Sequence, residues 1–337
     1  LGTKAQADPQ GQFVHEFSVS RPTTIHVWAK GNNSFTLYLT PGSKDTIAVA
    51  KDTINFSGTN RVYNRCLKAV DDYQQYSDNL IYMQPHELEG VTSLEQYHQL
   101  ADARMKQALD SVNASGLDKE FLAEQRAHID YTHRSIFLHV AMYLVKNENF
   151  TENWRKELAE IINQPVDSDY LRSYRGIGLF INDLIGAQFI KLENGKPEEI
   201  KDYCSFRFDR YRKFFKGDNL QYAQALLIYE DEFQTRNTPS IPQLYERYKA
   251  EFPNSPFLSV LEPGVNKNLR FQNSRIDDKD YHILPCDSTV ENLEDAVKPF
   301  KGKVIYIDVW ATWCGPCIKK FQYLPALKEK THNMDIV

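Results

Sequence analysis

Two cysteines separated by a glycine and a proline give the strongest chemical signal in this 337-residue sequence. Cys314 and Cys317 follow an apolar segment, and Pro316 suits the first turn of a helix, where a missing N–H costs nothing. We therefore expect Cys314 at a helix N-terminus, where free N–H groups and the helix dipole stabilise a thiolate. Cys317 would lie one turn inside, close enough to form a disulfide with Cys314.

This arrangement predicts thiol–disulfide exchange. The Cys314 thiolate would attack a substrate disulfide and form a mixed disulfide. Cys317, the buried resolving thiol, would then attack Cys314, which releases reduced substrate and leaves an intramolecular bond. No bound cofactor is implied beyond this redox-active disulfide, and the electrons would come from a partner thiol protein.

Asp308 is the expected proton acceptor, because Cys317 must lose a proton before it attacks. Residues 304–310 form a nearly continuous apolar run rich in β-branched side chains, which is typical of a central strand in a parallel sheet. A carboxylate in such a strand should have a raised pKa, which suits proton transfer directly or through water. The alternative is that Asp308 lies at a strand end and is merely solvated.

Other cysteines and histidines give weaker signals. The cysteine pair could form half of a zinc site, but no second Cys/His pair follows, and the Gly-Pro between the cysteines favours redox chemistry. The remaining cysteines are scattered, and we expect small buried hydrophobic residues at Cys66, Cys204 and Cys286. Three histidines share one predicted helix at spacings of five and six, which do not place them on one face: His128, His133 and His139.

The first part of the chain is predicted to be a small antiparallel β-sandwich over residues 1–58. Its short segments alternate apolar and polar residues and are separated by turn residues; they span 13–19, 24–28, 34–39, 46–49 and 53–56. Because the pattern begins abruptly, we expect a strand or more upstream of Leu1.

Residues 59–264 change to helical periodicity and are predicted to form an α-helical domain. Ser93 opens a capping box, and Asp118 caps the next helix. Further helices should begin at Thr151 and Pro197, and Gly217 with Asp218 should separate two more. Two Pro-containing segments, 253–256 and 262–264, predict a linker. Beyond it, residues 292–298 predict a short helix.

The charge and hydropathy of the chain argue against several classes of function. The formal net charge of −5 is spread along the chain without a basic block, so no nucleic-acid partner is expected. No apolar run reaches the roughly 20 residues that span a membrane. The first residue is Leu1 rather than Met, so we expect the natural start upstream, where a membrane anchor could lie.

The segment from Lys303 to Phe321 resembles the active-site segment of thioredoxin. It resembles still more the TlpA- and ResA-type thioredoxin-like reductases, in which a basic-hydrophobic run such as 318–321 follows the cysteines. The segments Leu-Thr-Pro-Gly at 39–42 and Phe-Pro-Asn-Ser-Pro at 252–256 are similar to those of larger cell-envelope members from Bacteroidetes-type bacteria. Among these relatives are lipoproteins with a β-domain and a helical region.

The resemblance implies a multidomain α+β fold: a small N-terminal β-sandwich, an α-helical middle domain and a partial thioredoxin-like α/β domain over 265–337. It implies a thiol-disulfide oxidoreductase of the periplasm or cell envelope that reduces or isomerises protein disulfides and is recharged by an upstream thiol donor. The cysteines would be supported by four neighbours: Trp310, Trp313, Gly315 and Pro316.

Two departures from the family pattern stand out. The family's proline five residues after the second cysteine is replaced by Gln322, with Pro325 three residues later. The chain also stops 20 residues after Cys317, so we expect a fragment that lacks the later strands and the loop with the facing cis-proline.

The alternative function is an envelope binding or scaffold protein whose β and helical domains recognise a ligand or client, with an inactive redox fragment. Oligomeric state does not follow from these residues.

Overall fold

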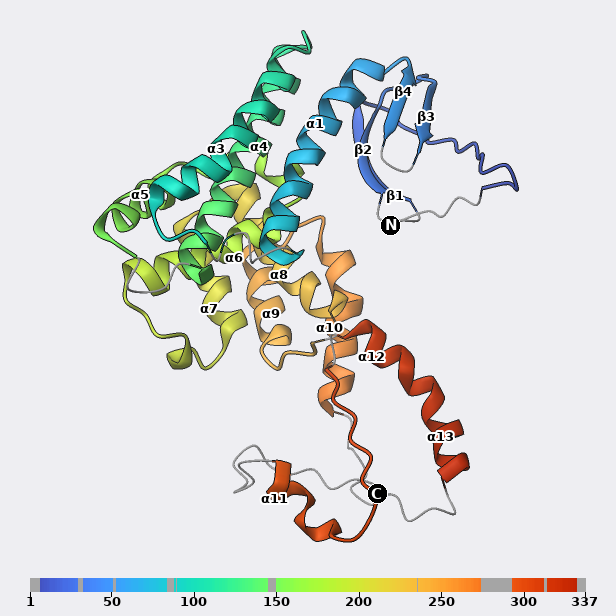
Figure 1. Cartoon of the computed structure of the whole chain (residues 1–337), viewed down its shortest axis with the longest axis vertical. Coiled ribbons are helices and arrows are strands. Elements are labelled where there is room, and N and C mark those ends of the chain that lie inside the picture. Colours follow the sequence, from blue (N-terminus) through green and yellow to red (C-terminus); the bar gives the residue numbers. More distant parts are fainter. Residues whose placement is uncertain are drawn as a thin grey trace. The chain divides into compact units, whose positions relative to one another are not determined.

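The computed structural model of the chain describes residues 7–29, 33–50, 53–83, 88, 90–144, 150–234, 236–273, 293–311 and 314–331. It divides into two compact units, Leu1–Glu199 and Ile200–Val337. Within the described ranges all paired strands belong to the first unit, and helices dominate both units (Figure 1). The predicted mixture of α and β structure is therefore confirmed.

Two antiparallel hairpins form the β part of the first unit. β1 (Thr23–Ala29) pairs with β2 (Asn33–Leu39), and β3 (Asp45–Val49) pairs with β4 (Ile54–Gly58). Because side chains alternate along a strand, one face of each hairpin buries its apolar residues. Phe35 of β2 meets Phe56 of β4 edge to face, with ring centroids 6.0 Å apart, so the two hairpins share one core.

The strand predicted over residues 13–19 is wrong. These residues form no ladder, and Phe13 and Val14 are 58% and 92% exposed. Alternation of apolar residues makes a strand only where a neighbouring strand can take up its backbone hydrogen bonds. Only Val19 at the end of the segment packs against the hairpin core.

A glycine closes the second hairpin. Gly58 has a φ of +107°, which L side chains rarely adopt, and a Cβ there would lie 2.8 Å from the Cα of Asp45. Only glycine therefore allows β4 to end this close to the start of β3.

Helices complete the first unit. They are α1 (Arg61–Asp78), α3 (Leu94–Asn113), α4 (Lys119–His139), α5 (Glu152–Asn163) and α6 (Ile177–Ala187), with π-helical turns at Asn79–Met83, Val140–Leu144 and Gln188–Leu192 and 3₁₀ turns at Leu171–Ser173 and Pro197–Glu199. The predicted caps are confirmed: Ser93 forms a full capping box with Gln96, and the Asp118 carboxylate accepts from Phe121 N. The helix predicted to begin at Pro197 is only a single 3₁₀ turn.

Aromatic side chains from three helices form the centre of this bundle. Tyr97 of α3, Phe137 of α4 and Trp154 of α5 are all buried, and their ring centroids lie 5.2–5.8 Å apart. Rings of this size contribute most of the buried apolar surface of a small core. These three rings therefore link α3, α4 and α5 in one core.

Helix α1 ties the hairpins to the bundle. The outer edge of β2 presents the N–H groups of Thr36 and Tyr38, which donate to the side chains of Asp71 (2.5 Å) and Asn64 (2.7 Å) of α1. An open sheet edge is thereby covered by side chains of a helix.

The second unit is helical. It contains α7 (Tyr203–Arg210), α8 (Gly217–Phe233), α9 (Ile241–Glu251), α10 (Leu258–Asn273), α11 (Leu293–Val297), α12 (Gly315–Lys320) and α13 (Leu324–Thr331), with 3₁₀ turns at Tyr211–Lys213, Lys298–Phe300 and Phe321–Tyr323. Asn268 of α10 bridges to α8, because its Nδ2 donates to Asp231 Oδ2 at 3.1 Å.

The linker predicted at Glu262–Gly264 is wrong, because α10 continues through Pro263 to Asn273. Gly264 is buried, and a Cβ there would clash with the Glu232 side chain of α8. Close packing of α10 on α8 outweighs the backbone hydrogen bond that proline removes.

The buried strand predicted over residues 304–310 is also wrong. These residues form no strand, and several of their apolar side chains are exposed, with Val309 86% exposed. A central strand requires hydrogen-bonding neighbours on both edges, and none of the described segments pairs with this one as a strand.

Candidate functional site

The cysteine motif lies at the start of a helix, as predicted. Cys314 is the N-cap of α12, and Cys317 lies in the first turn of that helix. The two cysteines form a disulfide with their Cα atoms 5.2 Å apart, inside the range that disulfides require. Both are partly buried, so the bond is not enclosed by protein.

The backbone around the motif fixes this arrangement. Cys314 N donates to Ala311 O at 2.9 Å, and Ile318 N donates to Cys314 O at 3.0 Å, the first hydrogen bond of the helix. Pro316 occupies the first turn, where no intrahelical N–H donation is lost. Gly315 is the first helical residue.

Trp310 packs against the helical segment that follows the motif. Its ring meets Phe321 edge to face, with centroids 4.9 Å apart and planes at 87°. This contact brings the segment before Cys314 back onto the chain after Cys317.

Asp308 and Trp313 are the other residues that the sequence predicts for the redox site. Asp308 is exposed, so the described residues do not form the apolar strand surroundings predicted for it. Trp313 lies outside the described residues.

The other cysteines are buried where the structure describes them. Cys66 and Cys204 are 3% and 7% exposed, and burial raises the pKa of both thiols. A neutral buried thiol is a poor nucleophile, so these residues behave as the small hydrophobic residues that the sequence predicts. Cys286 lies outside the described residues.

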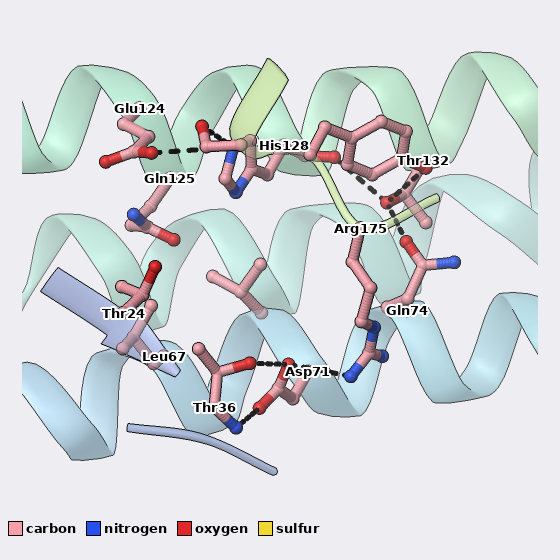
Figure 2. A pocket seen from close by; sticks show the side chains of 13 residues that line it. Thr24, Thr36, Leu67, Asp71, Gln74, Glu124, Gln125, His128, Thr132 and Arg175 are labelled. Carbon is pink, nitrogen blue, oxygen red and sulfur yellow. Dashed lines mark hydrogen bonds and ion pairs between the residues drawn. The ribbon is translucent and has the colours of Figure 1, made fainter. Parts of the chain in front are cut away.

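A second polar site lies within the first unit. Its walls come from β1, β2, α1, α4 and the 173–175 segment, and Figure 2 shows their side chains converging on one cavity. Asp71 accepts from Thr36 and pairs with Arg175 at 3.3 Å, while Thr132 donates to Gln74 at 2.9 Å.

Burial shifts the pKa values of the titratable side chains in and beside the walls of this cavity. It lowers the pKa of His128 in the wall. Beside the wall, next to Thr36 and Arg175, burial together with the Arg175 charge lowers the pKa of His26 to about 4. Both imidazoles are therefore neutral at pH 7. Burial also raises the pKa of the Asp71 carboxyl, against the opposing effects of Arg175 and the two Thr36 donors.

The sequence gives no indication of this second site. Its residues come from segments that are up to about 150 positions apart, between Thr24 and Arg175, and no spacing rule joins them. His128 is considered from sequence only as a metal ligand. Among the described residues, no group of three or more His, Cys, Asp or Glu side chains could hold a metal ion.

Comparison with known proteins gives one short similarity. The chain is 40% identical over 45 residues to the thiol-disulfide oxidoreductase ResA of Bacillus thuringiensis subsp. konkukian and to that of Bacillus cereus. The aligned part is 12% of this chain and spans about a quarter of each relative (26%). No protein-family model matches the chain. No solved structure matches it either.

Proposed function

We propose that the protein is a thioredoxin-like thiol-disulfide oxidoreductase that acts through Cys314 and Cys317. The observation that carries the proposal is the placement of Cys314 at the N-cap of α12 with its disulfide partner in the first turn. Free N–H groups at the start of a helix lower the pKa of a thiol there, so the thiolate forms more readily. The thiolate is the nucleophile of the exchange, and a thiol with a lower pKa is also a better leaving group. The short similarity to the two ResA oxidoreductases supports the same reaction class.

The reaction is a two-electron exchange. In the reduced protein, the Cys314 thiolate attacks one sulfur of a substrate disulfide, forms a Cys314–substrate bond and expels the other substrate sulfur as thiolate. Cys317 loses its proton and attacks Cys314 Sγ, which breaks the mixed disulfide and releases the second substrate thiolate. The protein is left oxidised and the substrate reduced, and a thiol protein upstream restores the dithiol.

Asp308 is proposed as the acceptor of the Cys317 proton. The proposal rests on its position six residues before Cys314 in an apolar segment. A carboxylate this close to the motif along the chain can accept the proton directly or through water. Because Asp308 is exposed here, this role requires the 304–310 segment to be covered by strands.

We further propose that the protein works in the periplasm or cell envelope on protein disulfides, in the manner of TlpA-type proteins of Bacteroidetes. Support comes from the sequence resemblance in the β and helical parts. No helix in the described ranges is long and apolar enough to span a bilayer.

Trapping of the mixed disulfide tests the proposal. In Cys317→Ser the resolving thiol is absent, so the reduced protein should accumulate a covalent adduct with a peptide disulfide that added dithiothreitol releases. Cys314→Ser should form no adduct at that position, and the double variant is the matched control. Reduction of a protein disulfide by Cys314→Ser at the wild-type rate would overturn the proposal.

Ligand binding is the second candidate function, and the polar cavity of the first unit favours it. That cavity is small and lined mainly by polar side chains rather than by aromatic rings. It suits a small polar group more than a hydrophobic client segment.

A further inference from the structure

We propose that the cavity of the first unit binds a primary ammonium group through Glu124 and Gln125 of α4. The site is formed by residues of the first unit alone, and the inference is independent of the redox reaction. The hydrogen-bonding groups of its walls support this assignment (Figure 2).

Gln125 provides a buried acceptor without a partner. The residue is 1% exposed, lines the cavity, and its Oε1 has no hydrogen-bond partner among the described residues. Figure 2 shows its side chain directed from α4 toward Thr24 across the cavity. Leaving a buried carbonyl oxygen unpaired is costly, so a donor at this position is favoured.

Glu124 provides the charge. Its side chain is 27% exposed, and its contact in the wall is His128 Nε2 at 3.8 Å, beyond hydrogen-bond distance. His128 is neutral at pH 7 because burial lowers its pKa, so it does not neutralise the carboxylate. His128 Nε2 also lies 3.1 Å from Ser173 Oγ, a shorter contact than the one with Glu124.

Three hydroxyl groups of the wall already donate hydrogen bonds to other protein atoms. Thr36 Oγ1 donates to Asp71 (2.9 Å), Thr132 Oγ1 to Gln74 (2.9 Å), and Ser173 Oγ to the carbonyl of Tyr170 (2.9 Å). The Gln125 oxygen and the Glu124 carboxylate keep acceptor capacity in the wall. An ammonium group has three donors and no acceptor, and matches it.

The charges of the wall also favour a cation. Arg175 is the cation among the lining residues, and its Nη1 pairs with Asp71 at 3.3 Å, which offsets its field. With His128 neutral and Arg175 paired with Asp71, the Glu124 carboxylate is the remaining charge in the wall. A charge-assisted hydrogen bond to Glu124 would be stronger than one between neutral groups.

The size of the cavity limits the ligand. It has about 60 Å³ of room for the centres of water-sized molecules. One water needs about 10–15 Å³ by this measure, so the cavity holds roughly four to six. An ammonium group with a short alkyl stem fits, either as a free amine or as the end of a lysine side chain.

Titration of the whole protein with ethylammonium chloride tests the inference. The side-chain amide signal of Gln125 is followed by ¹H–¹⁵N NMR and assigned by its loss in Gln125→Met. Sodium chloride at equal ionic strength controls for salt, and ethanol, of the same size, controls for the charge. We expect a saturable shift with a Kd on the order of millimolar for ethylammonium alone.

Two variants on the same helix locate the site. Glu124→Gln removes the charge in the cavity and should weaken binding about tenfold. Glu120→Gln is the matched control, because it makes the same change at an exposed position of α4 outside the cavity and should leave the Kd unchanged. Nα-acetyl-lysine amide separates the sources: binding about tenfold tighter than ethylammonium assigns a lysine side chain, and equal binding assigns a free amine.

Three results would overturn the inference. They are an ethylammonium response no larger than that of sodium chloride, an equal response to ethanol, and unchanged binding by Glu124→Gln. In each case the cavity does not select an ammonium group through Glu124 and Gln125.

Discussion

The pKa of the His26 imidazole is determined by its surroundings in the fold. Partial burial and the Arg175 charge lower its pKa to about 4, whereas an unfolded chain would titrate near the ordinary value of 6.5. The unfolded state therefore binds more protons between these values, and stability falls as the pH drops from about 6.5 toward 4. The neutral imidazole is the form that the fold prefers.

We expect the His26 imidazole to titrate with a midpoint near 4 in a proton NMR titration. Arg175→Gln should raise that midpoint, because the neighbouring cation is removed. A midpoint at 6.5 or above in the wild type would show that the imidazole is neither desolvated nor beside the guanidinium.

At the level of elements, Arg134 joins α4 to the end of α5. Its guanidinium is buried and donates to the carbonyls of Ile161 (3.1 Å), Gln164 (3.3 Å) and Pro165 (3.2 Å). The last carbonyls of a helix have no partner within the helix, so this side chain satisfies them from outside.

Arg134→Met should lower the free energy of unfolding by about 3 kcal/mol, because it removes the three hydrogen bonds that the buried guanidinium donates to these carbonyls. Urea unfolding followed by circular dichroism measures the change. Arg126→Met, at an exposed position of the same helix, should change it by less than about 0.5 kcal/mol. Equal effects of the two substitutions would contradict the capping role.

Substitution of Gly58 tests whether the close backbone approach between β4 and β3 matters for stability. Gly58→Ala should cost about 2 kcal/mol, since the new Cβ would meet the backbone of Asp45 at a positive φ. Gly116→Ala is the control: it also has positive φ but open space around the new Cβ, so its loss of stability should be smaller. Similar losses in urea unfolding would show that close approach at Gly58 does not matter.

Local signals explain which elements could be predicted. Ser93 and Asp118 cap their helices through atoms two or three residues away, so their sequence neighbours define them. The 304–310 segment could not be judged in this way, because a buried strand depends on partners elsewhere in the chain. The same reason explains the missed polar cavity, whose walls meet only after α1 and α4 pack.

At the level of the whole molecule, the two units each contain their own buried helices. The first has the Tyr97–Phe137–Trp154 cluster, and the second buries Tyr248, whose hydroxyl lies 2.6 Å from Ser255 Oγ. Units with separate cores should unfold separately.

We expect the fragment 1–199, which is the first unit, to fold alone. Its urea midpoint should match one transition of the whole chain, measured by circular dichroism. A fragment without a cooperative transition would show that the first unit depends on residues 200–337.

The redox reaction is the central claim, and a glutathione redox titration of the protein tests it most directly. Free thiols are trapped at each potential and located by mass spectrometry. We predict one reversible two-electron transition in which Cys314 and Cys317 are oxidised together, with about 30 mV for each tenfold change in the ratio of forms. The redox claim would be contradicted if Cys314 and Cys317 stayed reduced at every potential. It would also be contradicted if they paired at random with Cys66, Cys204 or Cys286.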